Sequence, residues 1–282
     1  MQLLSEHGCF GGVQRFYQFN SEQLGLPAKF SVYLPPVAVH QQQAVPVLLY
    51  LAGLTCTEET FMIKAGAQRL AAELGLALVC PDTSPRGAKV PGEADSWDLG
   101  LGAGFYLDAS QAPWSEHYRM QSYLHDELMP LLATELPIDL SKLGLFGHSM
   151  GGHGALTLAL KYPDWAKSLS AFAPICAPTQ CAWGEKAFTA YLGADQALWQ
   201  AHDATALMQK RNSPLLDSAI LIDQGLSDKF LDNQLNPKLF EKACENVRQV
   251  LTLRFHEGYD HGYYFISSFI EDHLRHHAKN LC

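Results

Sequence analysis

Short apolar segments that are typical of buried strands alternate with helical segments along most of the chain. Val45 to Ala52 is a nearly continuous apolar run, which suits a strand that is covered on both faces of a sheet. When a helix connects two neighbouring strands, the chain crosses over and the strands lie parallel. The order of segments therefore predicts an α/β fold with a mostly parallel central sheet and helices on both faces. The expected strands are Phe30–Pro35, Val45–Ala52, Ala77–Cys80, Leu143–Phe146, Leu169–Pro174, Ala219–Asp223 and Leu251–Phe255, and the expected helices are Thr60–Leu74, Trp114–Glu135, Gly152–Lys161, Pro237–Gln249 and Tyr263–Lys279.

Two long segments interrupt this alternation. Residues 83–113 are rich in Gly, Pro and Asp and are too long for an ordinary connection, so we expect them to have a function. Residues 178–207 are expected to form an inserted helical cap. The sequence contains no internal repeat and no linker rich in Pro or Ser, so we predict one domain over residues 1–282.

Composition and charge exclude several classes of protein. The net charge is -9 and no cluster of Lys and Arg is present, which argues against binding to a nucleic-acid backbone. The seven cysteines are scattered without the spacing of a zinc site or the density of a disulfide scaffold, which indicates reduced thiols in a cytosol. The first 14 residues do not resemble a signal peptide, and the longest apolar stretch, residues 45–54, is too short to cross a membrane. We therefore expect a cytoplasmic protein that binds neither nucleic acid nor membrane.

The segment Gly147-His148-Ser149-Met150-Gly151 matches the pattern G-x-S-x-G. In α/β-hydrolase folds this pattern forms a sharp turn between a strand and a helix, and the turn exposes the serine hydroxyl as a nucleophile. The expected strand before it and the small residues after it provide that context. The alternative interpretation is a glycine-rich turn with a capping serine. We predict an α/β-hydrolase fold with Ser149 as the nucleophile.

A serine nucleophile needs a base to remove its proton, and in this fold the acid and then the histidine follow the serine in the chain. His261 lies in a loop just after the last expected strand, whereas its rival His256 lies at the end of that strand and has less reach. We expect the histidines of the polar terminal helix to face solvent instead. These are His273, His276 and His277.

Three aspartates are candidates for the acid. Asp228 follows the strand that ends at Asp223 by a short loop containing Gly225, a position from which a carboxylate can meet the histidine. Asp223 lies closer to the strand and Asp232 lies further along. Asp228 could also be an ordinary turn or helix-capping residue.

The oxyanion of a tetrahedral intermediate needs two backbone donors in this fold. The chain leaves the early apolar strand through Gly53, where the backbone must bend, and a helix begins after Ser149. We assign the donors to the N–H groups of Leu54 and Met150. Gly53 has the alternative interpretation of a simple turn glycine.

Several of these segments together resemble the S-formylglutathione hydrolases, the esterase D family. The resemblance runs in order from about Gly11 to the terminal helix. It is carried by Gly53-Leu54-Thr55-Cys56-Thr57-Glu58, Trp97-Asp98, Gly102-Ala103-Gly104-Phe105-Tyr106, the run from Gly147 to Gly154, Asp223-Gln224-Gly225 with Asp228 and Phe230-Leu231, and Asp260-His261 before Tyr263-Tyr264-Phe265. One position departs from the pattern, because the family loop often carries two adjacent acids and here the first is Ser227.

The resemblance implies a cytosolic serine thioesterase that hydrolyses S-formylglutathione to formate and glutathione, a step of formaldehyde detoxification. It also implies side activity on short aryl esters, no metal or organic cofactor, and a homodimer. The catalytic triad of the family maps onto Ser149, Asp228 and His261, which favours Asp228 among the acids. A cysteine beside the active site maps onto Cys56, which is either a buried packing residue or an accessible thiol.

Other functions use the same residues. A general short-chain carboxylesterase would differ only in the shape of its pocket. An acyltransferase would need an apolar groove and export, and a non-catalytic binding module would typically lack part of the triad. Bulky side chains that could narrow the acyl pocket are Trp97, Met150 and Trp183, and cations that could meet the glutathione carboxylates are Lys64, Arg86 and Lys89.

Overall fold

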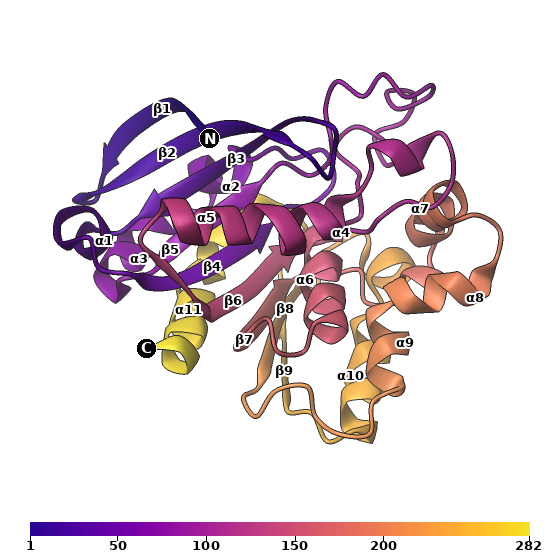
Figure 1. Ribbon diagram of the computed structural model, residues 1–282. Coiled ribbons are helices and arrows are strands. Elements are labelled where there is room, and N and C mark those ends of the chain that lie inside the picture. Colours follow the sequence, from indigo (N-terminus) through magenta and orange to yellow (C-terminus); the bar gives the residue numbers. More distant parts are fainter.

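A single nine-stranded sheet forms the centre of the computed structural model, which describes residues 1–282 (Figure 1). The strand order is β1-β2-β3-β5-β4-β6-β7-β8-β9. From β5 to β9 every neighbouring pair is parallel, and from β1 to β5 every pair is antiparallel. The structure thus confirms a mostly parallel sheet. The strands are β1 (Gln2–Cys9), β2 (Gly12–Ser21), β3 (Leu26–Leu34), β4 (Val45–Leu51), β5 (Ala77–Pro81), β6 (Ile138–His148), β7 (Ser168–Phe172), β8 (Ile220–Gly225) and β9 (Leu251–His256).

Two strands at the amino end were not predicted. β1 is exposed along most of its length, and neither strand is a buried apolar run. β1 pairs with β2 and β2 pairs with β3, so the two strands form an antiparallel extension at the edge of the sheet (Figure 1). An edge strand needs no continuous apolar sequence, because only part of its surface packs against the core.

Helices cover both faces of the sheet, as predicted. In Figure 1, α5 and α6 lie in front of the sheet and α11 lies behind it. The α-helices are α1 (Pro36–Gln41), α2 (Thr60–Lys64), α3 (Gln68–Leu74), α4 (Met120–Ser122), α5 (Met129–Glu135), α6 (Met150–Lys161), α7 (Ala182–Leu192), α8 (Gln196–Trp199), α9 (Ala204–Gln209), α10 (Pro237–Asn246) and α11 (Tyr263–Leu281). Short 3₁₀ or π turns are η1 (Trp114–Glu116), η2 (Tyr123–Leu128), η3 (Pro178–Gln180), η4 (Gln200–His202) and η5 (Leu231–Leu235).

Two of the expected helices are interrupted. The segment from Thr60 to Leu74 divides into α2 and α3 around Gly66, which has a φ of 72°. The segment expected to begin at Trp114 forms only a 3₁₀ turn there, and the continuous helix starts at Met120. In both cases the spacing of apolar residues along the sequence resembled that of one helix, because the separate pieces bury residues against the same core.

The segment 178–207 is helical, with η3, α7, α8 and η4 and the start of α9. In Figure 1 these helices lie at one end of the molecule, beyond the carboxyl end of β6 where α6 begins. That the chain forms one domain stays a prediction, although all nine strands join one sheet.

The prediction that the histidines of the terminal helix face solvent is wrong. His273 and His277 are completely buried on the face of α11 that packs against β6 and β7. His277 makes hydrogen-bond contacts with the hydroxyls of Ser168 (2.6 Å) and Ser170 (2.9 Å). These hydroxyls satisfy the imidazole, so polar side chains can occupy a face that the sequence pattern assigned to water.

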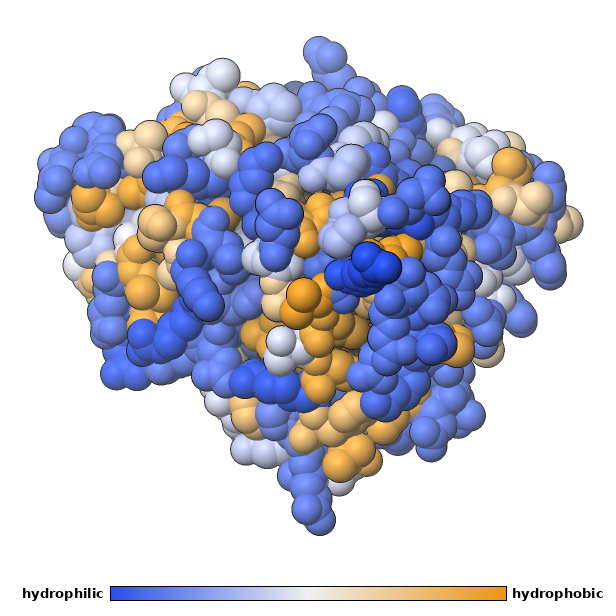
Figure 2. Space-filling view, turned by 90° about the horizontal axis from the view of Figure 1, so that it is seen from below, coloured by the Kyte–Doolittle hydropathy of each residue, from blue (hydrophilic) through white to orange (hydrophobic).

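The molecular surface is mixed in character. Figure 2, seen from below, shows hydrophobic residues in separate patches between hydrophilic ones. None of the helices combines the length and the apolar character that crossing a membrane requires.

Candidate active site

Ser149 lies at the sharp turn between β6 and α6. Its φ of 57° and ψ of -119° are strained for a residue with a side chain. A Cβ added at Gly151 would lie 1.9 Å from the carbonyl oxygen of Leu51, and one at Gly147 would lie 2.3 Å from that of Gly151. Only glycine fits at these two positions. The glycines of the motif therefore allow the turn to pack closely against β4 while the serine occupies its apex.

The three residues predicted as a triad lie within hydrogen-bond distance of one another. The Nε2 atom of His261 is 2.9 Å from the hydroxyl of Ser149, and its Nδ1 atom is 2.6 Å from Oδ2 of Asp228. They come from three separate places, namely the end of β6, the loop after β8 and the loop after β9. The Asp228 side chain is completely buried, while 17% of the His261 side chain remains exposed. A serine hydroxyl, an imidazole and a carboxylate are thus aligned at the carboxyl end of the parallel strands, which is the arrangement that a serine hydrolase requires.

Asp228 receives two further hydrogen bonds that the sequence analysis did not anticipate. The N–H of Phe230 donates to Oδ1 over 2.8 Å, and the side-chain amide of Gln224 donates to Oδ2 over 3.1 Å. Donors on both oxygens fix the orientation of the carboxylate. Gln224 belongs to the Asp223-Gln224-Gly225 segment of the resemblance, which was the available signal.

The rival acids and the rival histidine lie elsewhere. Asp223 pairs with Arg254 over 2.5 Å and with His273 over 3.2 Å, and Nε2 of His256 is 3.2 Å from its Oδ1. Burial acts to raise the pKa of Asp223, but the hydrogen bonds from His273 and Arg254 prevail and hold it well below its usual range. Asp232 lies exposed on η5. Asp223 and His256 thus belong to a separate network within the sheet.

The loop after β4 lies directly against the nucleophile. A Cβ on Gly53 would be 3.0 Å from Nδ1 of His148 and 3.2 Å from Cβ of Ser149. The N–H of the next residue, Leu54, donates to no backbone carbonyl. Met150 is the first residue of α6, where N–H groups have no partner within the helix. The N–H groups of the two predicted oxyanion donors therefore have no backbone partner. Met150 follows Ser149 in the chain, and Leu54 follows Gly53, which lies against Ser149.

His148 lies buried beside the base. Its ring centroid is 4.5 Å from that of His261, and neither of its ring nitrogens has a hydrogen-bond partner within the chain. Burial, and then the neighbouring His261, lower the pKa of His148 well below its ordinary value. His148 is consequently neutral at physiological pH and adds no charge beside His261.

Cys56 is half-buried in the same loop as Leu54. Burial raises the pKa of its thiol, which disfavours the nucleophilic thiolate at neutral pH. No group of three or more His, Cys, Asp or Glu side chains is arranged to hold a metal ion.

Aromatic side chains extend from the base toward the surface. Phe230 packs on the ring of His261 with centroids 5.1 Å apart, Trp183 packs on Phe230 at 4.6 Å, and Trp97 packs edge-on against Trp183 at 5.7 Å. Trp97 is 54% exposed, whereas Trp183 is buried. Met150, the third bulky side chain considered, is completely buried.

The cations considered for glutathione differ in their surroundings. Arg86 pairs with Asp82 over 2.6 Å, Lys64 lies 5.7 Å from the ring centre of Tyr263, and Lys89 is exposed. A cation that the sequence analysis missed, Lys229, lines a cavity of about 380 Å³ that includes His261. The other lining residues are Ser227, Asp260 and Gly262.

A parallel sheet with helices on both faces and a serine at a strained strand-to-helix turn defines a hydrolase of the α/β-hydrolase fold. Residues 21–276 match the family model named Esterase. An S-formylglutathione hydrolase from Rattus norvegicus is 50% identical over 282 residues, which cover 100% of this chain and 99% of the rat protein. One from Arabidopsis thaliana is 54% identical over 99% of this chain and 98% of the plant protein.

A solved structure agrees with these sequences. The S-formylglutathione hydrolase of Agrobacterium tumefaciens is 50% identical, superimposes with a TM-score of 0.95 and covers 100% of both chains. The chain belongs to the S-formylglutathione hydrolase (esterase D) family.

Proposed function

We propose that this protein is a serine thioesterase that hydrolyses S-formylglutathione to formate and glutathione. The observation that carries the proposal is the continuous contact Asp228–His261–Ser149 at the turn before α6. It occurs in a chain that is about half identical over its full length to proteins named S-formylglutathione hydrolase. Fold and triad alone would not choose the substrate, so the thioester assignment rests on the family.

The first half of the reaction acylates Ser149. Nε2 of His261 removes the hydroxyl proton as the oxygen attacks the formyl carbon, and Asp228 stabilises the resulting imidazolium through Nδ1–H. The N–H groups of Leu54 and Met150 bind the oxyanion of the tetrahedral intermediate. When this intermediate collapses, the C–S bond breaks and the imidazolium gives its proton to the leaving glutathione sulfur, so that neutral His261 stays beside the formylated Ser149. Thiolate is a good leaving group, so positioning and oxyanion binding contribute more than protonation of sulfur.

The second half repeats the same steps with water. His261 removes a proton from water as its oxygen attacks the formyl ester, and the same two N–H groups bind the new oxyanion. Collapse of this intermediate releases formate and returns the proton to Ser149. No electron acceptor or cofactor takes part in either half. The bonds formed and broken balance as hydrolysis of one thioester.

The cavity at His261 is consistent with an anionic substrate. The net charge of the protein is -9, so long-range attraction does not bring glutathione carboxylates to the surface. Lys229 and Asp260 both line this cavity, and we assign a carboxylate of the substrate to Lys229.

Four further parts of the proposal come from the family resemblance. They are a role in formaldehyde detoxification, side activity on short aryl esters, a cytoplasmic location and a homodimeric state. Light scattering on the purified protein measures the last of these directly, and a monomer at micromolar concentration would remove it.

The substrate is tested by comparing kcat/KM for S-formylglutathione, S-acetylglutathione and a short p-nitrophenyl ester. We expect a preference of at least about tenfold for the formyl over the acetyl thioester, because a methyl group must enter a pocket sized for hydrogen. Ser149→Ala is the control and should remove several orders of magnitude of kcat while the protein stays folded. Equal rates on both thioesters, or faster rates on butyryl esters, would favour a general short-chain carboxylesterase instead.

A further inference from the structure

The loop that carries Leu54 has a backbone that must be held in place. Thr55 has a φ of 69°, which costs free energy for a residue with a branched side chain. Its N–H donates to the carbonyl of Gly102 over 2.9 Å. A Cβ on Gly102 would lie 3.0 Å from Cα of Thr55, so the two backbones are in close contact. The strained residue is therefore fixed on one side by the long segment 83–113.

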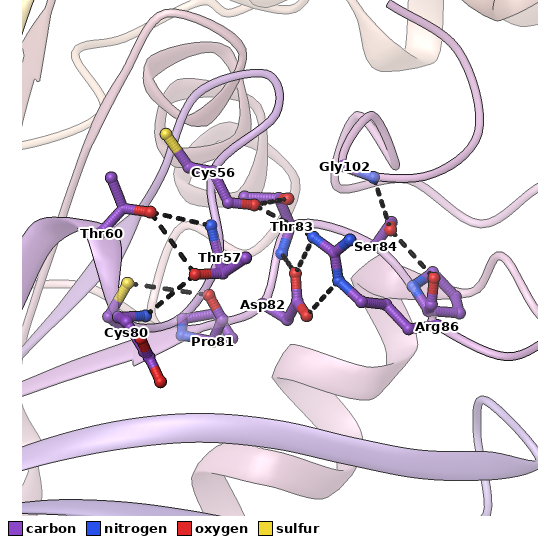
Figure 3. A network of polar contacts seen from close by, with 12 residues as sticks. Cys56, Thr57, Thr60, Cys80, Pro81, Asp82, Thr83, Ser84, Arg86 and Gly102 are labelled. Atoms are coloured by element: carbon purple, nitrogen blue, oxygen red, sulfur yellow. Dashed lines mark hydrogen bonds and ion pairs between the residues drawn. The ribbon is translucent and has the colours of Figure 1, made fainter. Parts of the chain in front are cut away.

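The carbonyl oxygen of Cys56 is fixed on another side. It accepts a hydrogen bond from the hydroxyl of Thr83 over 2.5 Å and a second one from Nη2 of Arg86 over 3.3 Å (Figure 3). A carbonyl oxygen has two lone pairs, so these two donors satisfy it fully. Both donors come from the segment that follows β5, the strand next to β4 in the sheet.

A buried carboxylate holds both of these donors. Asp82 accepts the N–H of Thr83 over 2.7 Å, and it binds the guanidinium of Arg86 through both oxygens, at 2.6 and 2.9 Å (Figure 3). Asp82 is 7% exposed and Thr83 is completely buried. A two-point contact between Arg and a carboxylate fixes the direction of the guanidinium as well as its position.

The same segment also holds Gly102. The hydroxyl of Ser84 accepts the N–H of Gly102 over 2.8 Å (Figure 3). The carbonyl of Gly102 in turn accepts the N–H of Thr55. Residues 82–86 thus determine where the N–H of Thr55 and the carbonyl of Cys56 lie. These two groups belong to the two residues that follow Leu54.

We propose that Thr83 and Arg86, oriented by Asp82, are positioning residues for the oxyanion hole. By fixing the Cys56 carbonyl they hold residue 56, whose N–H donates to the carbonyl of Gly53 over 3.3 Å. That carbonyl shares a peptide plane with the Leu54 N–H, so the direction of the Leu54 N–H is set before substrate binds. A donor stabilises a transition state most when it needs no reorganisation at the moment of reaction. The inference rests on the proposed function, because it takes Leu54 as one of the two oxyanion donors.

The test uses a matched pair of substitutions at one buried site. Thr83→Val keeps the shape of the side chain and removes its donor, whereas Thr83→Ser keeps the donor. Arg86→Gln, at a side chain that is 40% exposed, provides a second route if the first variant does not fold. Arg15→Gln is the control, since it removes an Arg–carboxylate pair, with Glu6, on β2.

Three quantities are measured for each variant. The first is kcat and KM on both S-formylglutathione and p-nitrophenyl acetate, because an oxyanion hole serves either substrate. The second is the inhibition constant of phenylboronic acid, whose tetrahedral adduct with serine places an oxygen where the oxyanion forms. The third is the fraction of competent sites, counted by titration with a fluorophosphonate, so that loss of folded protein is separated from loss of rate.

We expect Thr83→Val and Arg86→Gln to lower kcat per titrated site about tenfold to a hundredfold, somewhat less than removal of a donor outright. In these two variants KM should change by less than about threefold, and the inhibition constant of the boronic acid should rise by the same factor as kcat falls. The kcat of Thr83→Ser should stay within about threefold of the wild-type kcat. The proposal is overturned if Thr83→Val matches Thr83→Ser, or if kcat falls while boronic acid affinity does not. Failure of the wild type to hydrolyse S-formylglutathione would instead overturn the proposed substrate and leave this comparison on p-nitrophenyl acetate intact.

Discussion

Replacing Asp228 by asparagine tests how the base is held. The carboxylate now accepts from three donors, namely the N–H of Phe230, the side-chain amide of Gln224 and Nδ1–H of His261. An asparagine side chain has one acceptor oxygen and one NH₂ group in the same space. It cannot satisfy donors on both sides, so the outcome depends on which way the amide turns.

One orientation of the amide damages catalysis and the other costs stability. If its oxygen faces Phe230, its NH₂ donates to Nδ1 of His261 and moves the ring proton to Nε2, where the imidazole can no longer accept the proton of Ser149. If its oxygen faces His261, the NH₂ opposes the Phe230 N–H and leaves a buried donor unsatisfied, at a cost of about 1–3 kcal/mol. The first orientation opposes only the Gln224 side-chain amide, which can turn so that its unpartnered oxygen accepts from the new NH₂ group, whereas the Phe230 N–H cannot turn. We therefore expect the first orientation and a fall in kcat of roughly 10³–10⁴, as for other triads that lose the carboxylate.

The assay is steady-state hydrolysis of S-formylglutathione by Asp228→Asn and Asp223→Asn, with folded protein quantified by circular dichroism. Asp223 is equally buried but contacts Arg254 and His273. Its variant should be less stable and should keep kcat per folded molecule within about threefold of the wild type, since loss of a buried partner destabilises without touching the base. A folded Asp228→Asn variant that retained more than a tenth of wild-type kcat, or the opposite ranking of the two variants, would refute this reasoning.

Two further predictions concern a thiol and the buried histidines. Iodoacetamide should inhibit the wild type by modifying Cys56 and obstructing the pocket. Inhibition should be faster at higher pH, because burial raises the pKa of the Cys56 thiol. The Cys56→Ser variant should stay active and lose this sensitivity, and equal inhibition of that variant would assign the effect to another cysteine. Burial lowers the pKa of His153 to about 4 and that of His277 well below its ordinary value. Below about pH 6.5 the unfolded chain therefore binds more protons than the folded chain. The free energy of unfolding should consequently fall as the pH drops from about 6.5 to 4. Thermal unfolding across this range measures the slope, which His277→Gln should flatten; a pH-independent melting temperature would mean that these imidazoles are not neutral in the folded protein.

The sequence was sufficient to predict the parts of the fold that depend on neighbouring residues. Short apolar segments between helical segments indicated the parallel strands from β4 to β9. The most continuous of them, Val45 to Ala52, predicted β4, because a strand buried on both faces needs apolar side chains at nearly every position. The glycines around Ser149 marked the turn before α6, since only glycine fits where a Cβ would meet the carbonyl of Leu51. The order of Ser149, Asp228 and His261 also came from the sequence, and the structure places the three within hydrogen-bond distance. Their catalytic roles stay predictions.

The tertiary structure alone decided which polar side chains are buried and what they contact. A polar terminal helix predicted solvent around His273 and His277. Inside the protein, however, two hydroxyls of β7 satisfy His277, and one hydroxyl of β7 and the carboxylate of Asp223 satisfy His273. In the same way Asp223 and Asp228, five residues apart, belong to different networks, because β8 directs one to Arg254 while the following loop directs the other to His261. The pattern of a sequence reports whether a side chain is apolar. Whether a polar side chain finds its partner depends on residues far away in the chain, which only the folded structure brings together.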